Sequence, residues 1–300
     1  MGQDPTRKKA YLAVIFLMIL WGIDYAAIKI VQGSLSTLTL MFIRYLLGFF
    51  VISFIMLLNP RRVKLRARHI PMMILCAFLG EIFYYYCEYS ALRYMPAALV
   101  TVILTFTPVV SAVMDRIIHK RKLSAVAITA MVICVLGVGL IIGLDMDEIR
   151  AGRLIGYIFC FCAVLLWASY NFAIEKLEGD FDSVSLTFYQ VVLVLILLAP
   201  VGIHQFPGFE VFNDHIILIA ILFSGFLCEG IGFLIYIAGL RALGPTDMVT
   251  LNNLLPVSTA VFGWILLGEH LTPMQVFGMA VVIIASFVVV RNTEDKEIRP

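Results

Sequence analysis

Long runs of apolar residues, separated by short polar segments, recur along the whole chain. Ten of them are long enough for a helix of about 20 residues, which spans about 30 Å of hydrocarbon. They lie at about 10–30, 36–58, 70–92, 96–116, 123–143, 153–176, 183–203, 215–240, 246–267 and 273–291. Turn and cap signals such as Gly244-Pro245 and Thr272-Pro273 mark several joints. The pattern predicts an all-α membrane protein with ten transmembrane helices.

The second half of the chain repeats the first at an offset of 148 residues. Phe78-Leu79-x-Glu81 then matches Phe226-Leu227-x-Glu229, and Pro108-Val109 matches Pro256-Val257. Equivalent helices are five apart, an odd number, so we expect two inverted five-helix repeats that enclose a central cavity. The predicted repeats are 10–143 and 153–291, with tails at 1–9 and 292–300. A duplicated helical membrane unit makes transport the first hypothesis.

Composition and charge agree with a membrane location. Hydrophobic residues make up 62% of the chain and charged residues 14%, more apolar surface than a soluble core can bury. If the N-terminus is cytoplasmic, 17 of the 22 Lys and Arg residues lie on that side, four lie opposite, and Arg44 lies within a helix. The positive-inside rule therefore predicts a multi-pass protein of the cell membrane with both termini cytoplasmic.

Other classes of protein lack support in the sequence. The six cysteines lie in apolar runs without metal-ligand spacing, and Walker, GxSxG and HExxH motifs are absent. We therefore expect no enzyme, no cofactor and no metal site. The basic run at 61–68 suits a short loop beside anionic lipid better than nucleic acid. The expected partners are a small-molecule substrate and membrane lipid, with the chain a monomer or homodimer.

Two glutamates lie near the middle of equivalent helices. A carboxylate such as Glu81 or Glu229 in hydrocarbon costs on the order of a few kcal/mol, so it normally faces a cavity or a partner. Burial favours the neutral form, and a group that ionises when water or a cation arrives can couple a substrate to protons. The alternative is a protonated Glu that bonds a neighbouring helix. Recurrence under the repeat favours the cavity.

The helix at 70–92 carries an acidic and aromatic face. Glu81, Tyr84, Tyr85 and Glu88 follow at spacings of three, four and seven residues, which places them on one side of a helix. Ring faces and a carboxylate together suit an amine or quaternary ammonium group. A tyrosine cluster near the lipid headgroups is an equally good interpretation.

Further candidates lie at membrane depth. Asp24 and Arg44 are expected to form a structural ion pair. Trp21 and Trp167, related by an offset of 146, either line the cavity or pack between helices.

Two prolines lie in mid-helix at equivalent positions. Pro108 and Pro256 interrupt the hydrogen-bond ladder, and Asn252 and Asn253 supply polar groups beside the second. Opened helices near the midplane are where transporters expose backbone to substrate, although a static kink is the alternative. The match under the repeat favours a hinge or a site.

Several motifs together resemble the EamA family of the drug/metabolite transporter superfamily. They are Trp21-Gly22, Phe42-Ile43-Arg44-Tyr45, Thr107-Pro108-Val109, Leu166-Trp167-Ala168, Leu255-Pro256-Val257 and Leu267-Gly268-Glu269-His270-Leu271-Thr272-Pro273. The resemblance covers two units at about 13–143 and 156–290, and the first lacks the Gly and Glu of the last motif. It implies a central cavity and alternating access that moves small metabolites, commonly outward.

The function predicted from these features is secondary transport. We expect a proton-coupled exporter of a small metabolite, with cationic, amine or amino-acid substrates as candidates. A gradient-driven uniporter or importer is the main alternative. A membrane-embedded lipid-handling protein is the third possibility. Such a protein would need an acid/base cluster at headgroup depth, and the sequence shows none.

Overall fold

A computed structural model describes residues 5–60, 62–120, 123–142 and 153–294. Within these ranges every regular element is a helix. The predicted tails at 1–9 and 292–300 lie partly outside the described residues, and residue 143, where the first predicted repeat ends, lies outside them. Arg121, Lys122 and Arg150, which were counted in the charge distribution, also lie outside them.

The helices follow the predicted runs closely. The first half contains α1 (Pro5–Val31), α2 (Thr37–Leu58), α3 (Ile70–Cys76), α4 (Tyr84–Leu92), α5 (Ala97–Leu104), α6 (Thr107–Ile118) and α7 (Ala125–Ile142). The second half contains α9 (Leu154–Glu178), α10 (Ser183–His204), α11 (His215–Leu222), α12 (Gly232–Leu243), α13 (Pro245–Asn252), α14 (Leu254–Leu267) and α15 (Pro273–Glu294). The π-helices η2 (Ala77–Phe83) and η5 (Phe223–Ile231) join α3 to α4 and α11 to α12, and short 3₁₀ helices occur at η1 (Ala67–His69) and η4 (Phe209–Asn213).

Nine helices in the described ranges are long and apolar enough to cross a membrane. The tenth predicted run, 246–267, is divided into α13 and α14, and only the shorter apolar helix α14 is continuous there. The prediction of an all-α, multi-pass membrane protein is therefore confirmed. In the described part, nine helices instead of ten meet the length and hydropathy needed to cross a membrane, and one of the nine is interrupted between α5 and α6.

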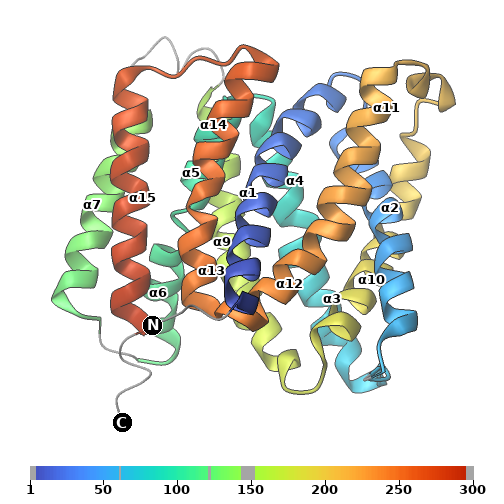
Figure 1. Cartoon of the computed structure of the whole chain (residues 1–300), viewed down its shortest axis with the longest axis horizontal. Helices are drawn as coiled ribbons and strands as arrows, with labels where there is room; N and C mark the ends of the chain where they lie inside the picture. Colours follow the sequence, from blue (N-terminus) through green and yellow to red (C-terminus); the bar gives the residue numbers. More distant parts are fainter. Residues whose placement is uncertain (1–4, 61, 121–122, 143–152, 295–300) are drawn as a thin grey trace.

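The chain starts and finishes at the same end of the helical bundle. In Figure 1, α1 begins and α15 ends at the lower end. The composite helix α3–η2–α4 runs upward in this view, and α11–η5–α12 runs downward. The two helices that contain π-helical segments therefore have opposite directions.

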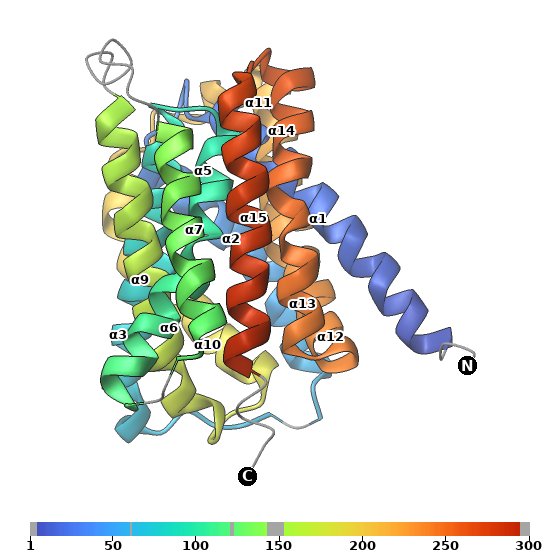
Figure 2. The same ribbon diagram turned by 90° about the vertical axis from the view of Figure 1, so that its left-hand side faces the viewer.

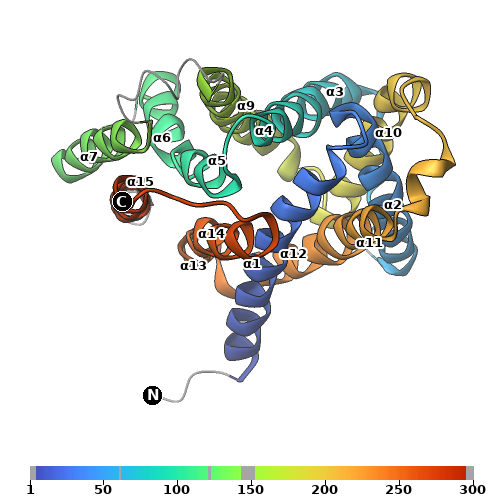
Figure 3. The ribbon, with the colours of Figure 1, turned by 90° about the horizontal axis from the view of Figure 1, so that it is seen from above.

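Helices α7 and α15 pack against each other along one edge of the molecule (Figures 2 and 3). Glycines permit the close approach. A Cβ added to Gly137 would lie 2.9 Å from side-chain atoms of Val281 and Val282, and one added to Gly278 would lie 2.9 Å from the carbonyl oxygen of Gly137. Gly139, on the same helix, has open space around it.

The start of α15 has the predicted cap. Thr272 Oγ1 accepts a hydrogen bond from the backbone N–H of Gln275 at 3.2 Å, and Gln275 Oε1 accepts from the N–H of Thr272 at 2.9 Å. This reciprocal pair is a capping box, which satisfies two N–H groups that the helix itself leaves open.

The two glycines of α7 provide a matched test of this packing. Gly137→Ala should lower the thermal unfolding temperature by several degrees, because overpacking at a rigid contact costs about 1–3 kcal/mol. Gly139→Ala should leave the temperature unchanged or raise it, because Ala favours a helix over Gly. Thermal unfolding of the purified chain in detergent measures both. Equal temperatures for the two variants would show that α7 and α15 do not pack this closely.

Candidate functional site

Helix interruptions occur at equivalent positions of the two halves, near the centre of the molecule. The π-helices η2 and η5 overlap under the offset of 148, and they contain Glu81 and Glu229. π-helical turns are rare and frequently occur at functional sites. The second pair of interruptions separates α5 from α6 at residues 105–106 and α13 from α14 at Asn253. The first lies shortly before Pro108 and the second shortly before Pro256.

Three of these interruptions, η5, residue 105 and Asn253, contribute residues to a cavity of about 440 Å³, whereas no residue of η2 lines it. The residues predicted for the site that line it are Trp21, Asp24, Arg44, Tyr84, Tyr85, Glu88, Pro108, Trp167, Glu229, Asn252 and Asn253. The sequence analysis missed Tyr25, Ser111, Asn171, Cys228, Phe233 and Tyr236, which also line it. Part of this set was detectable, because the offset of 146 relates Tyr25 to Asn171, and the offset of 148 relates Tyr85 to Phe233.

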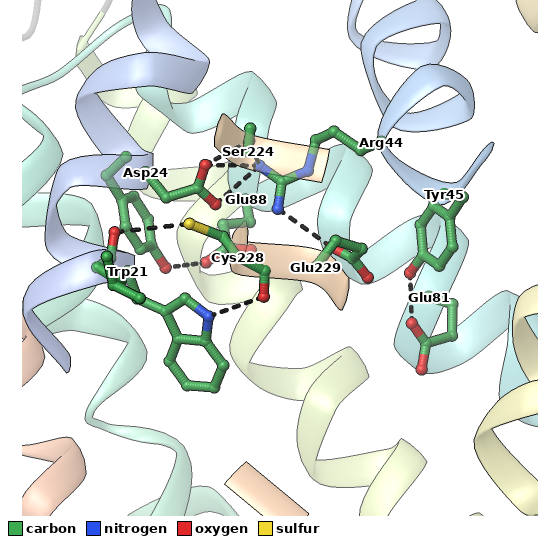
Figure 4. Close-up of polar contacts among 11 residues, drawn as sticks. Trp21, Asp24, Arg44, Tyr45, Glu81, Glu88, Ser224, Cys228 and Glu229 are labelled. Atoms are coloured by element: carbon green, nitrogen blue, oxygen red, sulfur yellow. Dashed lines mark hydrogen bonds and ion pairs between the residues drawn. The ribbon is translucent and has the colours of Figure 1, made fainter. Parts of the chain in front are cut away.

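Arg44 lies at the centre of a buried charged network (Figure 4). Its Nη1 donates to Asp24 Oδ1 at 3.0 Å and Oδ2 at 2.8 Å, and its Nη2 donates to Glu229 Oε2 at 3.1 Å. Ser224 hydrogen-bonds both Arg44 and Asp24. The guanidinium also lies over the ring of Tyr89, 5.3 Å from its centroid. The expected pair of Asp24 and Arg44 is thus present, and it gains Glu229 from the second half.

Glu88 has a different environment. Its carboxylate accepts hydrogen bonds from the hydroxyl groups of Tyr25 and Tyr84. Within the described residues no cation forms an ion pair with it. The ring of Tyr84 lies 4.7 Å from that of Trp167 and 4.9 Å from that of Tyr85. An acid without a cationic partner therefore adjoins a group of aromatic rings on the cavity wall.

Two of the predicted site residues do not line the cavity. Glu81 accepts a hydrogen bond from the hydroxyl of Tyr45, away from the Arg44 network (Figure 4). Successive side chains of a helix differ by about 100° in direction, so Arg44 and Tyr45 meet different partners. Of the two glutamates expected to face the cavity, Glu229 is among its lining residues and Glu81 is not. Pro256 is buried in α14, and the opened turn at Asn253 faces the cavity in its place.

The repeat relates the charged network to a neutral one. The offset of 146 relates Asp24 to Tyr170 and Arg44 to Gln190. The side chains of Tyr170 and Gln190 hydrogen-bond each other at 3.3 to 3.4 Å. Glu88 corresponds to Tyr236 at the offset of 148. The two halves thus place polar pairs at equivalent positions, but the pair on α1 and α2 is charged.

Polar contacts also join the two halves at both ends of the bundle. Where α1 ends, Glu269 pairs with Lys29 and accepts from the backbone N–H of Ala97 at 2.9 Å. At the opposite end, Arg68 pairs with Asp180 at 3.2 Å. Glu269 belongs to the motif that the first half lacks, and the sequence analysis gave it no role.

Known proteins resemble the chain along nearly its whole length. The family model described as "EamA-like transporter family" matches residues 8–143 and 154–291. "Uncharacterized transporter YoaV" of Bacillus subtilis is 19% identical over 281 residues, which cover 93% of this chain and 96% of that protein. "Probable amino-acid metabolite efflux pump" of Salmonella typhimurium is 22% identical over 294 residues, 93% of each chain.

A solved crystal structure has the same fold. It superposes with a TM-score of 0.60 over 94% of this chain and 98% of its own, at 16% sequence identity. The family match covers most of the chain in two units, as the sequence motifs predicted. The chain is therefore a membrane transporter and belongs to the EamA-like transporter family.

Proposed function

We propose that this transporter exports a small cationic metabolite, an amine or amino acid, in exchange for protons. The excess of acid in the cavity carries the proposal. Among the described residues that line it, Asp24, Glu88 and Glu229 are the acids and Arg44 is the one cation. If all were ionised, three negative charges and one positive charge would leave these side chains with a net charge of −2. Such charges are costly inside a membrane, so protons or a cationic substrate must neutralise them.

Glu88 and the neighbouring rings form the proposed site for the positive charge of the substrate. Among the described residues Glu88 accepts hydrogen bonds from two tyrosine hydroxyls alone, and a substrate ammonium group can supplement them. Tyr84, Tyr85 and Trp167 offer ring faces for cation–π contact. Asn252 and Asn253 offer amides to the rest of the molecule. Trp21 donates to the carbonyl of Cys228 at 3.3 Å, so its role is to form the wall.

Glu229 and Glu81 are the proposed titrating groups. The Glu229 side chain is 15% exposed and shares Arg44 with Asp24, so protonation of Glu229 leaves Arg44 with a partner. Glu81 is not among the residues that line the cavity. Its proposed role is therefore limited to proton coupling through the hydrogen bond that it accepts from Tyr45.

The proposed mechanism is alternating access by two inverted five-helix repeats. In this arrangement α13 and α14 form the tenth span, interrupted at Asn253. The opposite directions of α3–η2–α4 and α11–η5–α12 support it, and so does the common end at which α1 begins and α15 ends. Pro108 and Pro256 serve as hinges beside the interruptions. The contacts of Glu269 with Lys29 and of Arg68 with Asp180 join the halves at opposite ends here, and in the proposed cycle each of them breaks in turn.

The proposed location is the cell membrane, with both termini cytoplasmic and the chain a monomer or homodimer. Export is supported by the relative named as an efflux pump, which covers 93% of each chain. A uniporter or importer is the alternative function, in which the same acids bind a cation without moving protons.

Removal of the cavity acids tests the proposed function. Glu88→Gln and Glu229→Gln should each lower transport of a bound amine at least about tenfold, because a charge-assisted hydrogen bond contributes about 1.5–3 kcal/mol. The measurement is flux in proteoliposomes under an imposed pH gradient, with an amine first identified by thermal shift. Glu81→Gln, outside the cavity wall, should keep the affinity for the amine and change only the pH dependence.

Two results would contradict this assignment in different ways. Unchanged rate and pH dependence in both cavity variants would remove the acids from the mechanism. A wild-type rate that ignores the pH gradient, with weakened binding in the variants, would identify a uniporter.

A double-mutant cycle tests whether Asp24 and Arg44 act as a structural pair. Arg44→Gln should strongly lower thermal stability, since it leaves Asp24 and Glu229 without their cation and breaking a buried pair costs about 3–5 kcal/mol. Asp24→Asn should cost less, because Arg44 keeps Glu229 as a partner. The double variant should lose less than the sum of the two. Gln190→Leu, at the position equivalent to Arg44, should cost less than Arg44→Gln because it leaves no charge unpaired. Additive losses would argue against the pairing.

A further inference from the structure

The described residues between α2 and η1 alternate basic and apolar side chains from Arg62 to Arg66. Residues 62–66 are not helical, and Arg66 has φ −109° and ψ 150°. Arg62, Lys64 and Arg66 line the same pocket, and Arg68 in η1 lines it with them, so these four residues form one basic row.

Backbone contacts fix the basic row in place. The N–H of Val63 donates to Ser185 Oγ at 3.1 Å, and its carbonyl accepts from the hydroxyl of Tyr189 at 3.0 Å. Arg62 donates to the carbonyls of Leu57 and Asn59 at the end of α2, at 3.0 and 3.1 Å. The segment is thus attached both to α10 and to α2. These contacts fix the backbone at Val63 and the side chain of Arg62, and so position the segment that carries Lys64 and Arg66.

A pocket of about 410 Å³ lies along this row. Its lining includes Arg62, Lys64, Arg66 and Arg68, together with His69 and Asp180. Asp180 receives hydrogen bonds from Arg68 at 3.2 Å and lies 3.1 Å from His69 Nε2. In the described part of the chain, neither Lys64 nor Arg66 has an acidic partner. The pocket therefore has an excess of positive charge that Asp180 does not neutralise.

Apolar side chains next to the row place it at a lipid surface. Leu57 and Leu58, at the end of α2, are 65% and 68% exposed, and Ile70, at the start of α3, is 41% exposed. Both helices belong to membrane-crossing spans, so the row lies where they leave the hydrocarbon. An anion with acyl chains satisfies both the basic pocket and these exposed residues.

We propose that the basic row binds the phosphate group of an anionic membrane phospholipid. Lys64 and Arg66 supply the free charges, and the acyl chains lie against Leu57, Leu58 and Ile70. A bound headgroup also competes with Asp180 for Arg68. Because Asp180 belongs to the second half, the lipid acts on a contact between the halves. This site is separate from the transport cavity and does not depend on the identity of the substrate.

Lipid binding to the purified full-length chain tests the proposal. Native mass spectrometry should show that phosphatidylglycerol binds more tightly than phosphatidylcholine. The variant Lys64→Ala/Arg66→Ala should bind phosphatidylglycerol at least about tenfold more weakly. The matched variant Lys8→Ala/Lys9→Ala removes two exposed charges of α1 and should bind like the wild type. Thermal unfolding without lipid should be the same for all three proteins, because the mutated side chains are exposed.

Competition with inorganic phosphate tests whether the pocket binds the phosphate group of a lipid or a free phosphate ion. Phosphate should not displace phosphatidylglycerol, because it lacks acyl chains. Displacement by phosphate at comparable concentration would assign the pocket to a soluble anion and overturn the lipid proposal. Equal binding of both lipids, or undiminished phosphatidylglycerol binding by Lys64→Ala/Arg66→Ala, would also overturn it.

Discussion

The buried guanidinium of Arg44 constrains the centre of this protein. Arg cannot lose its proton, so its charge must be matched by nearby acceptors wherever it is removed from water. Asp24 on α1 and Glu229 on η5 meet this requirement at 2.8 and 3.1 Å. These acids come from different halves of the chain, and Arg44 comes from α2. One charge therefore holds three helices together at the cavity, and displacement of any of them leaves an ion unpaired.

The backbone around this network is adapted to admit Glu229. A π-helical turn contains an extra residue, which shifts the direction of the side chains that follow it. Gly48, one turn beyond Arg44 on α2, gives the necessary space, because a Cβ there would lie 2.9 Å from Cγ of Glu229. The winding of η5 and the glycine of α2 thus act together. A side chain at position 48 would push Glu229 away from Arg44.

The sequence predicted what depends on local pattern and missed what depends on contacts between distant segments. Helix positions followed from the lengths of apolar runs, and the interruptions near Pro108 and Pro256 followed from proline. The π-helices have no comparable residue signature, so neither was predicted. Glu81 and Glu229 match under the repeat, but the helices beside them differ, because α10 has Gln190 at the position where α2 has Arg44. The sequence match therefore did not show that the two glutamates have different surroundings. The contacts of Glu269 with Lys29 and Ala97 bridge distant parts of the chain, which no local pattern reveals.

If the transporter works by the proposed alternating access, this difference between the halves affects the proposed proton coupling. Alternating access by inverted repeats requires the two halves to exchange conformations, so that each element takes the place of its equivalent. Glu81 would then take the setting that Glu229 has here, and it would face Gln190 and Tyr170 instead of Arg44 and Asp24. A buried carboxyl group that faces an amide has no nearby cation to stabilise its ionised form, so the protonated form is favoured. In the proposed mechanism, the asymmetry between the halves would thus favour protonation of Glu81 in one state and its ionisation in the other.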